Sequence, residues 1–194
     1  MLLCGGSSKR FGSDKLLAVI PGEEAGGPIG ARAALNLLEG AGNALAVIPP
    51  GATRLRAALE GAGCEVLESD RTALGMGASL AAAVAATDRA DGWIVALGDM
   101  PLVAPATIRA VRDALCAGAL LAAPVSARGG VRGHPVGFSS ALRAELLALC
   151  GDLGARGVLD RHRDALRVLP TDDPGILVDL DTPGELAEAA RRRS

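Results

Sequence analysis

The chain has 194 residues, of which 49% are hydrophobic and 22% are charged, and its formal net charge is −2. This composition is that of an ordinary globular protein, and the length suffices to bury a core without disulfide or metal staples. The slightly negative charge and an aromatic content of only 2% exclude the basic surface and the base-stacking platforms that general nucleic-acid binding requires.

The sequence also excludes a membrane protein and the common cysteine motifs. No run of about 18 apolar residues occurs, and we expect no signal peptide before the first strand. Cys4, Cys64, Cys116 and Cys150 lack C-x-x-C spacing, which excludes the usual zinc and thiol-redox sites. We expect these cysteines to be small buried side chains in the reducing cytoplasm.

Short apolar runs alternate with helical patterns along the chain. The predicted strands are Met1–Cys4, Ala44–Ile48, Cys64–Glu68, Gly92–Leu97, Leu120–Pro124, Val136–Phe138, Ala165–Leu169 and Ile176–Asp179. The predicted helices lie near Gly30–Glu39, Ala52–Glu60, Ser79–Thr87, Pro105–Ala117, Ser140–Leu149, Ala155–Arg163 and Pro183–Arg193. This alternation predicts a mostly parallel sheet with helices on both faces, and we interpret residues 1–194 as one α/β domain. In such sheets ligands bind at the loops that follow the strands.

The loop after the first strand reads GGSSKRFGSDK. Its candidate phosphate-binding residues are Gly5, Gly6, Ser7, Ser8, Arg10 and Lys15. The adjacent glycines allow close approach of a ligand, and consecutive amides there can form an anion-binding nest. The serines add hydroxyl donors, and the arginine and lysine add cationic contacts. The set predicts a polyphosphate site, although the loop matches neither the Walker A motif nor G-x-G-x-x-G; the alternative is a surface loop with solvated cations.

The next glycine-rich loop, LGMGASLAAAVAA, leads into a predicted helix. Gly77 lies in the turn, and we expect Ser79 or a neighbour to cap the helix. An ordinary helix start explains both residues without any ligand.

The segment WIVALGDMPLV places Asp99 directly after an apolar strand. Mg²⁺ prefers one or two carboxylates together with substrate phosphates and water. Asp99 is therefore a candidate metal ligand opposite the cationic first loop. The alternative is a solvated aspartate in a turn.

A second cationic stretch, GGVRGHPVGF, follows the fifth predicted strand. Arg132 and His134 flank Gly133 at the sheet edge where the other loops are expected to gather. Cations there would suit an anionic acceptor substrate. The alternative for His134 is a structural histidine.

The last predicted strand ends in two alternating acids, Asp179 and Asp181. Residues i and i+2 share one face of a strand, so both acids could point into one site. Thr182, Pro183 and Glu185 form a capping box at the start of the next helix. This helix start explains the three capping residues but does not explain the two acids.

Together these motifs resemble a known family. LLCGGSSKRFGSDKLL is similar to the signature L-x-G-G-x-S-x-R-[FM]-G-x-D-K-L of nucleotidyltransferases with the nucleotide-diphospho-sugar transferase fold. The segments GMGAS, GDMP, RGHP and DLDTPGEL resemble the branch that attaches CMP to the molybdenum cofactor. The resemblance spans Leu2 to Leu186 and implies an α/β three-layer sandwich, in which a twisted, mostly parallel sheet contains one antiparallel strand.

The resemblance also implies roles for individual residues. Catalysis would depend on Arg10, Lys15 and Asp99. Asp99 and Asp181 would hold Mg²⁺, or Mn²⁺ as the alternative, with Asp179 as a nearby helper. The nucleotide would contact Cys4, Gly5, Gly6, Ser7, Ser8, Arg10, Lys15, Gly77 and Ser79. The phosphate acceptor would contact Arg132, His134 and Arg156.

The implied enzyme is a Mg²⁺-dependent nucleotidyltransferase that moves CMP from CTP to the phosphate of a molybdopterin-type cofactor and releases pyrophosphate. Gly5 stands where the cytidylyl branch usually has alanine, so GTP is an alternative donor, and a sugar or polyol phosphate is an alternative acceptor. The expected partners are these small molecules and a client molybdenum enzyme or its chaperone, without nucleic acid or membrane. An interpretation of another class is a non-catalytic factor that only binds the molybdenum cofactor.

Overall fold

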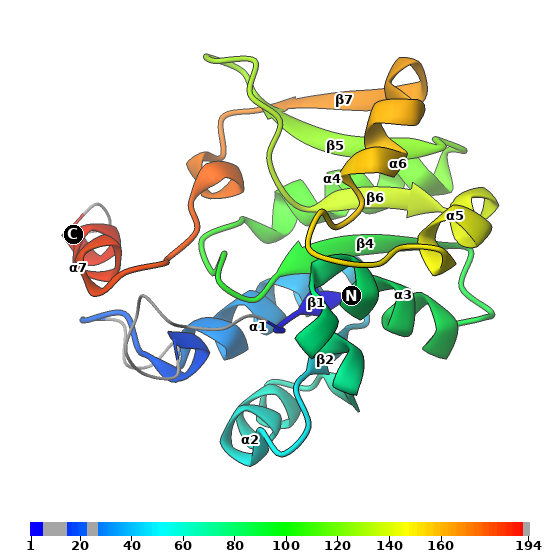
Figure 1. The fold of residues 1–194 in the computed structure, drawn as a ribbon. Coiled ribbons are helices and arrows are strands. Elements are labelled where there is room, and N and C mark those ends of the chain that lie inside the picture. Colours follow the sequence, from blue (N-terminus) through cyan, green and yellow to red (C-terminus); the bar gives the residue numbers. More distant parts are fainter. Residues whose placement is uncertain (6–14, 23–26, 192–194) are drawn as a thin grey trace.

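Seven strands form one sheet in the computed structural model of the chain, which describes residues 1–5, 15–22 and 27–191, with side chains through residue 188. The strands are β1 (Leu2–Leu3), β2 (Leu45–Ile48), β3 (Glu65–Glu68), β4 (Gly92–Leu97), β5 (Leu121–Ser126), β6 (Val136–Ser139) and β7 (Leu166–Thr171). Their order across the sheet is β3-β2-β1-β4-β6-β5-β7 (Figure 1). β6 runs antiparallel to both of its neighbours, whereas the other paired strands of the described chain are parallel. The predicted α/β class, with a mostly parallel sheet and one antiparallel strand, is confirmed.

Helices cover both faces of the sheet (Figure 1). One layer holds α1 (Ile29–Ala41), α2 (Thr53–Gly61) and α4 (Pro105–Cys116), and the other holds α3 (Met76–Ala86), α5 (Arg143–Leu147) and α6 (Arg156–Arg161). α7 (Pro183–Arg191) lies beyond the strand ends, near the N-terminal segment that contains Lys15. Short 3-10 helices are η1 (Lys15–Leu17), η3 (Asp70–Leu74), η4 (Ser140–Leu142), η5 (Arg163–Ala165) and η6 (Pro174–Leu177). Within the described ranges, no helix combines the length and hydrophobicity needed to cross a bilayer.

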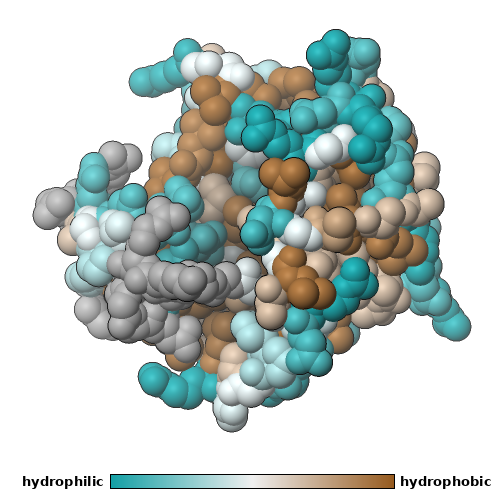
Figure 2. Space-filling model, viewed as in Figure 1, coloured by the Kyte–Doolittle hydropathy of each residue, from teal (hydrophilic) through white to brown (hydrophobic). Residues whose placement is uncertain are grey.

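Two hydrophobic cores, one on each face of the sheet, explain the continuous apolar strands. Successive side chains of a strand point to opposite faces, so Ile94 packs under α1 and α4 while Trp93 and Val95 pack under α3 and α5. β1 divides in the same way, with Leu2 in one core and Leu3 in the other. On the outer face over α3, α5 and α6, hydrophilic surface interrupts the hydrophobic surface (Figure 2). The central strands therefore carry little polar chemistry, which is left to the loops at their ends.

The prediction of a strand over Ile176–Asp179 is wrong, because this segment overlaps the 3-10 helix η6. Asp173 explains the difference. Its Oδ1 atom accepts a hydrogen bond from the N–H of Gly175 at 2.9 Å. Its Oδ2 atom accepts from the N–H of Ala104 at 2.8 Å and from the hydroxyl of Thr107 at 2.7 Å. These bonds fix a turn against the start of α4, and they outweigh the local apolar pattern.

Smaller deviations concern one helix and two cysteines. The helix expected over Ser140–Leu149 is a 3-10 turn, η4, followed by the short helix α5. Cys4 and Cys64 are buried as expected, whereas Cys116 and Cys150 are exposed. The exposed pair corrects the expectation that all four thiols lie in the core.

The crossing of α1 and α4 generates a prediction about stability. At Gly40 a Cβ atom would lie 2.5 Å from Cβ of Ile108 and 2.7 Å from the carbonyl oxygen of Pro105. We expect Gly40→Ala to destabilise the protein by about 1–3 kcal/mol, because the added methyl group forces the helices apart. Urea unfolding followed by circular dichroism measures the effect.

Gly61→Ala, at the end of α2, is the matched control. A Cβ atom there meets nothing within 4 Å, so this change should stabilise the protein by about 0.4–1 kcal/mol through the unfolded state. Equal stabilities of the two variants would contradict the tight crossing at Gly40.

Candidate active site

Three charged side chains from distant parts of the sequence meet beyond the carboxyl ends of β1 and β4. The Nζ atom of Lys15 donates hydrogen bonds to Asp99 Oδ2 at 2.8 Å and to Asp181 Oδ1 at 2.7 Å. One cation thus bonds both carboxylates, which we call the acid pair. The three side chains are 12%, 26% and 28% exposed, respectively, so the cluster is largely shielded from water.

Close packing of β1 against β4 positions Asp99. The N–H of Gly98 donates to the carbonyl oxygen of Leu3 at 3.0 Å, and a Cβ atom on Gly98 would lie 2.8 Å from Sγ of Cys4. Only glycine leaves room for this approach. The chain therefore turns directly after the sheet and presents Asp99 at the strand ends.

A backbone hydrogen bond brings Asp181 next to Asp99. The N–H of Leu180 donates to the carbonyl oxygen of Asp99 at 3.0 Å, and the Leu180 side chain is fully buried. The N–H of Asp181 donates to Glu185 Oε2 at 2.8 Å, within the capping box of α7. The shared strand face predicted for Asp179 and Asp181 is wrong, because no strand forms there, and Asp181 reaches the cluster through this loop instead.

The 3-10 helix η1 fixes the backbone of Lys15. Its next residue, Leu16, is buried, and a Cβ atom on Gly30 of α1 would lie 3.3 Å from Leu16 Cβ. Burial by itself lowers the pKa of Lys15, but the hydrogen bonds to Asp181 and Asp99 outweigh it, so the pKa is raised above its ordinary value. Lys15 is therefore a cation at neutral pH.

The acid pair fits a divalent cation. Asp99 Oδ1 is buried and has no hydrogen-bond partner among the described residues, although an unpaired buried oxygen is costly. The described part of the chain contains no group of three or more His, Cys, Asp or Glu residues that could hold a metal ion. Two carboxylates are nevertheless the donor set that Mg²⁺ uses when substrate phosphates and water complete its coordination, and Mn²⁺ accepts the same oxygen ligands.

The predicted nucleotide loop is described only at its two ends. Gly6, Ser7, Ser8 and Arg10 lie outside the described residues. Cys4 is buried, and burial raises the pKa of its thiol. A Cβ atom on Gly5 would lie 2.9 Å from Cβ of Thr72 and 3.3 Å from Oγ of Ser79. The chain thus leaves the sheet close against the start of α3, and the nucleotide contacts of these residues stay predictions.

The start of α3 packs against the loop before α6. The N–H of Gly77 donates to the carbonyl oxygen of Gly151 at 2.8 Å, and a Cβ atom on Gly77 would lie 2.8 Å from the carbonyl oxygen of Cys150. Ser79 is buried in the first turn of α3 and is not its cap, because its hydroxyl donates to the carbonyl oxygen of Gly75 at 3.0 Å. Both residues therefore have packing roles, and their contact with a nucleotide stays a prediction.

A pocket of about 360 Å³ brings together the three predicted acceptor residues, Arg132, His134 and Arg156. Leu3 and Leu97 also line it, and they end β1 and β4 just before the candidate site begins. Apolar side chains of α3, β6 and α6 form much of the remaining wall. This acceptor pocket therefore lies at the same strand ends as the acid pair.

His134 is a buried polar group of the acceptor pocket. Its Nδ1 atom has no hydrogen-bond partner among the described residues. Burial lowers the pKa of His134 and outweighs the opposing effects of a backbone hydrogen bond to Val95 and of the Asp99 carboxylate. The imidazole is therefore neutral at neutral pH and offers a hydrogen bond rather than the expected positive charge.

Asn36 has a positioning role that the motifs did not reveal. Its Nδ2 atom donates to the carbonyl oxygens of Pro101 at 2.9 Å and of Val103 at 3.0 Å. The α1 helix thereby holds the loop that follows Asp99. The available signal was a single polar residue within the apolar run AALNLL.

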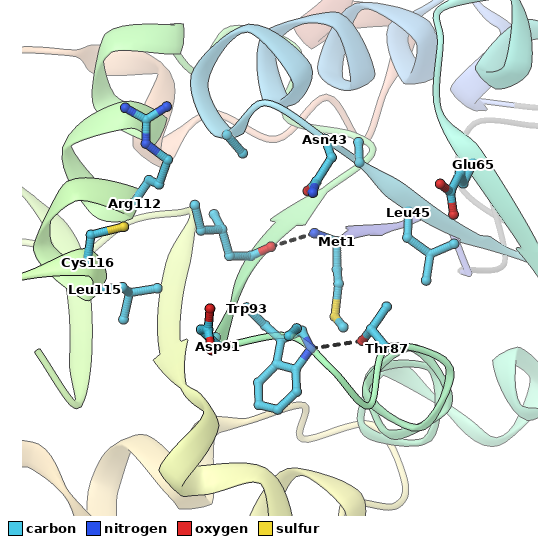
Figure 3. A pocket seen from close by; sticks show the side chains of 15 residues that line it. Met1, Asn43, Leu45, Glu65, Thr87, Asp91, Trp93, Arg112, Leu115 and Cys116 are labelled. Carbon is cyan, nitrogen blue, oxygen red and sulfur yellow. Dashed lines mark hydrogen bonds between the residues drawn. The ribbon is translucent and has the colours of Figure 1, made fainter. Parts of the chain in front are cut away.

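A second pocket, of about 350 Å³, lies at the opposite edge of the sheet, around the amino ends of β1, β2 and β4 (Figure 3). There the Met1 amino group donates to the carbonyl oxygen of Ile94 at 2.7 Å, and the Trp93 indole donates to Thr87 Oγ1 at 2.9 Å. Its lining contains none of the predicted site residues. The candidate site therefore remains at the carboxyl ends of the strands.

Comparisons with known proteins show the family to which the chain belongs. A family model described as MobA-like NTP transferase domain matches residues 1–166. The crystal structure of Rv0371c from Mycobacterium tuberculosis H37Rv is similar, with a TM-score of 0.79 and 27% identity over 98% of this chain and 96% of that chain. The complex of Rv0371c with manganese gives a TM-score of 0.77 and 26% identity over the same shares. No curated protein sequence matches the chain.

A more distant structure shows the fold alone. The nucleotidyl transferase Mth528 from Methanothermobacter thermautotrophicus has a TM-score of 0.78 at 22% identity, over 100% of this chain and 97% of that chain. The arrangement of strands and helices is thus shared along the whole chain.

The buried His134 predicts a pH dependence of folding. Its pKa lies below 6.5 in the folded protein, whereas in the unfolded chain it stays near 6.5, so the unfolded state binds more protons in this range. The stability that neutral His134 contributes is therefore present above about pH 6.5 and is lost as the pH falls toward the lower, folded pKa. Urea unfolding between about pH 7.5 and 5.5 should show a steeper loss of stability for wild type than for His134→Gln. Parallel curves would contradict the lowered pKa.

Proposed function

The chain belongs to the family of MobA-like NTP transferase domains, and from this premise we propose that it transfers CMP from CTP to the phosphate of a molybdopterin-type cofactor and releases pyrophosphate. The observation that carries the proposal is the convergence of Asp99 and Asp181 on one cation at the strand ends. In this proposal residues 1–194 act as one domain in the cytoplasm, and the product passes to a molybdenum enzyme or its chaperone.

Asp99 and Asp181 are the proposed ligands of Mg²⁺, with Mn²⁺ as the alternative. The manganese complex of Rv0371c, 26% identical to this chain, supports a divalent cation. Asp99 Oδ1, which is buried and has no hydrogen-bond partner in the described part of the chain, supports the same assignment from this chain's own geometry. When bound, the ion would neutralise negative charge on the transferred phosphoryl group.

In the proposed reaction, a phosphate oxygen of the acceptor attacks the α-phosphorus of CTP. A new P–O bond forms while the bond from the α-phosphorus to the oxygen that bridges to the β-phosphate breaks, and pyrophosphate leaves with the electron pair. No side chain becomes covalently attached, so catalysis rests on positioning and charge neutralisation. Lys15 would stabilise the charge on the leaving pyrophosphate, together with Arg10, which lies outside the described residues.

The acceptor pocket is the proposed site of the pterin phosphate. Arg132 and Arg156 supply positive charge, and neutral His134 supplies a hydrogen-bonding group. The apolar walls suit a flat ring system next to the phosphate. The resemblance of GMGAS and RGHP to the cytidylyl branch favours CTP over GTP, and a sugar or polyol phosphate is the alternative acceptor.

Pyrophosphate release from CTP, in the presence of Mg²⁺ and the pterin phosphate, tests the proposed reaction. Asp99→Asn should lower kcat by about 10²–10³, the usual cost of removing one electrostatic stabiliser, while circular dichroism shows the variant still folded at the assay temperature. Asp164→Asn is the matched control, because this carboxylate is 98% exposed just before β7, and it should keep full activity.

Other outcomes of this assay are equally specific. Release of pyrophosphate from GTP but not from CTP would show that GTP is the nucleotide donor in place of CTP. The protein could also release no pyrophosphate from either nucleotide, with Mg²⁺ or with Mn²⁺, and still bind the cofactor. That result would contradict the proposed enzyme activity and favour a non-catalytic cofactor-binding factor.

The acceptor pocket generates a separate prediction. Arg156→Ala should raise KM for the phosphate acceptor by about 10- to 100-fold, because it removes one charge-assisted hydrogen bond, and should leave KM for the nucleotide unchanged. Arg163→Ala is the control, since Arg163 is similarly exposed, at 82% against 76%, but does not line the pocket. An unchanged KM for the acceptor in Arg156→Ala would show that the acceptor binds outside this pocket.

A further inference from the structure

Lys15 lies where a divalent cation would have to bind. Its Nζ atom is 2.8 Å from Asp99 Oδ2 and 2.7 Å from Asp181 Oδ1, so one positively charged atom already bridges the acid pair. We propose that Lys15 competes with the metal ion for the acid pair, and that the triphosphate relieves this competition by giving the ammonium group another partner. The inference rests on the proposed function, because it takes the acid pair as the metal site and Lys15 as a contact of the triphosphate.

Charge opposes the presence of both cations at the acid pair. The ammonium group and the two carboxylates carry one negative charge in total. A divalent ion added beside the ammonium group would place three positive charges against two negative ones. Because the Lys15 side chain is only 12% exposed, water and salt screen this repulsion poorly. A metal ion that arrives while Lys15 remains in place therefore binds weakly.

Coordination distances point the same way. Mg²⁺ binds oxygen ligands at about 2.0–2.1 Å, whereas Lys15 holds its two carboxylate oxygens at 2.8 and 2.7 Å. To share one metal ion, Asp99 and Asp181 must close around it. The space into which they close is the space that the ammonium group occupies.

Lys15 can exchange partners without a change in its backbone. Leu16 anchors η1 in the core beside Gly30 of α1, whereas the four-carbon stem of the lysine is flexible. Lys15 also ends the loop that the sequence predicts to bind triphosphate. A bound triphosphate carries enough negative charge to replace both carboxylates as the partner of the Lys15 ammonium group.

The consequence is coupled binding of metal ion and nucleotide. Metal alone binds the wild-type acid pair weakly, and each ligand strengthens the binding of the other by the same factor, because a coupling free energy is reciprocal. The exchange also moves the Lys15 ammonium group to the phosphates when the metal ion replaces it between the two carboxylates. Metal ion and lysine thus reach their working positions together.

Titration of Mn²⁺ into the protein without nucleotide tests this inference, with free Mn²⁺ measured by electron paramagnetic resonance. Lys15→Gln removes the charge and keeps a polar side chain, and we expect it to bind Mn²⁺ about 5- to 150-fold more tightly than wild type, the usual span of such coupling. Asp99→Asn, added to Lys15→Gln, should remove the gain. Equal or weaker Mn²⁺ binding by Lys15→Gln overturns the inference.

Arg56 supplies a matched control. Its guanidinium group bridges Glu60 at 2.8 Å and Glu68 at 3.0 Å on the surface, so Arg56→Gln also releases two carboxylates from a shared cation. We expect this variant to bind Mn²⁺ as wild type does. If Arg56→Gln gained as much affinity for Mn²⁺ as Lys15→Gln, the gain would come from the change in net charge alone, and the inference would be overturned.

Lys15→Arg keeps the inference testable if Lys15→Gln does not fold. Arginine retains the charge, so Mn²⁺ binding without nucleotide should stay as weak as in wild type, and clearly tighter binding overturns the competition.

Failure of the proposed function has another signature: Mn²⁺ binding, measured with CTP present, is then unchanged by Asp99→Asn. Binding that needs Asp99 but is equal in wild type and Lys15→Gln refutes the competition alone.

Discussion

The ammonium group of Lys15 holds side by side two carboxylates that would otherwise repel each other. Asp99 comes from the loop after β4 and Asp181 from the loop before α7, and the hydrogen bond from the Leu180 N–H to the Asp99 carbonyl brings the two residues together. A fully exposed ion pair would contribute little, but this cluster is largely shielded from water. It ties the N-terminal segment, the sheet and the C-terminal helix together at the point where the chemistry is proposed to occur.

Burial of the sheet on both faces decides where polar chemistry can lie. Side chains of β1 and β4 enter one core or the other, so charged groups are left to the strand ends. Glycine then sets how closely the elements meet there: Gly98 lets β4 turn against Cys4, and Gly77 lets α3 pack on the loop before α6. These contacts bring the acid pair and the acceptor pocket to one edge of the sheet.

The two parts of the site differ in electrostatic character. The acid pair consists of two carboxylates bridged by the Lys15 ammonium group, whereas the acceptor pocket has two arginines and a neutral, buried histidine. An anionic donor and an anionic acceptor can approach one another only if positive charge is supplied on both sides. Lys15 supplies it on one side and can do so only by leaving the carboxylates, so the same side chain stabilises the fold and takes part in the proposed reaction.

The sequence by itself determined the α/β class, most helices and strands, and the family signature around Lys15 and Asp99, because hydrophobic periodicity and glycine-rich turns are properties of short segments. Only the tertiary structure decided that Ile176–Asp179 is no strand, since the Asp173 cap takes its partners from α4. It alone revealed Asn36 as the support of the Asp99 loop and His134 as a neutral group. Hydrogen bonds between distant segments, desolvation and the meeting of like charges depend on how the chain packs, and local sequence patterns carry no record of them.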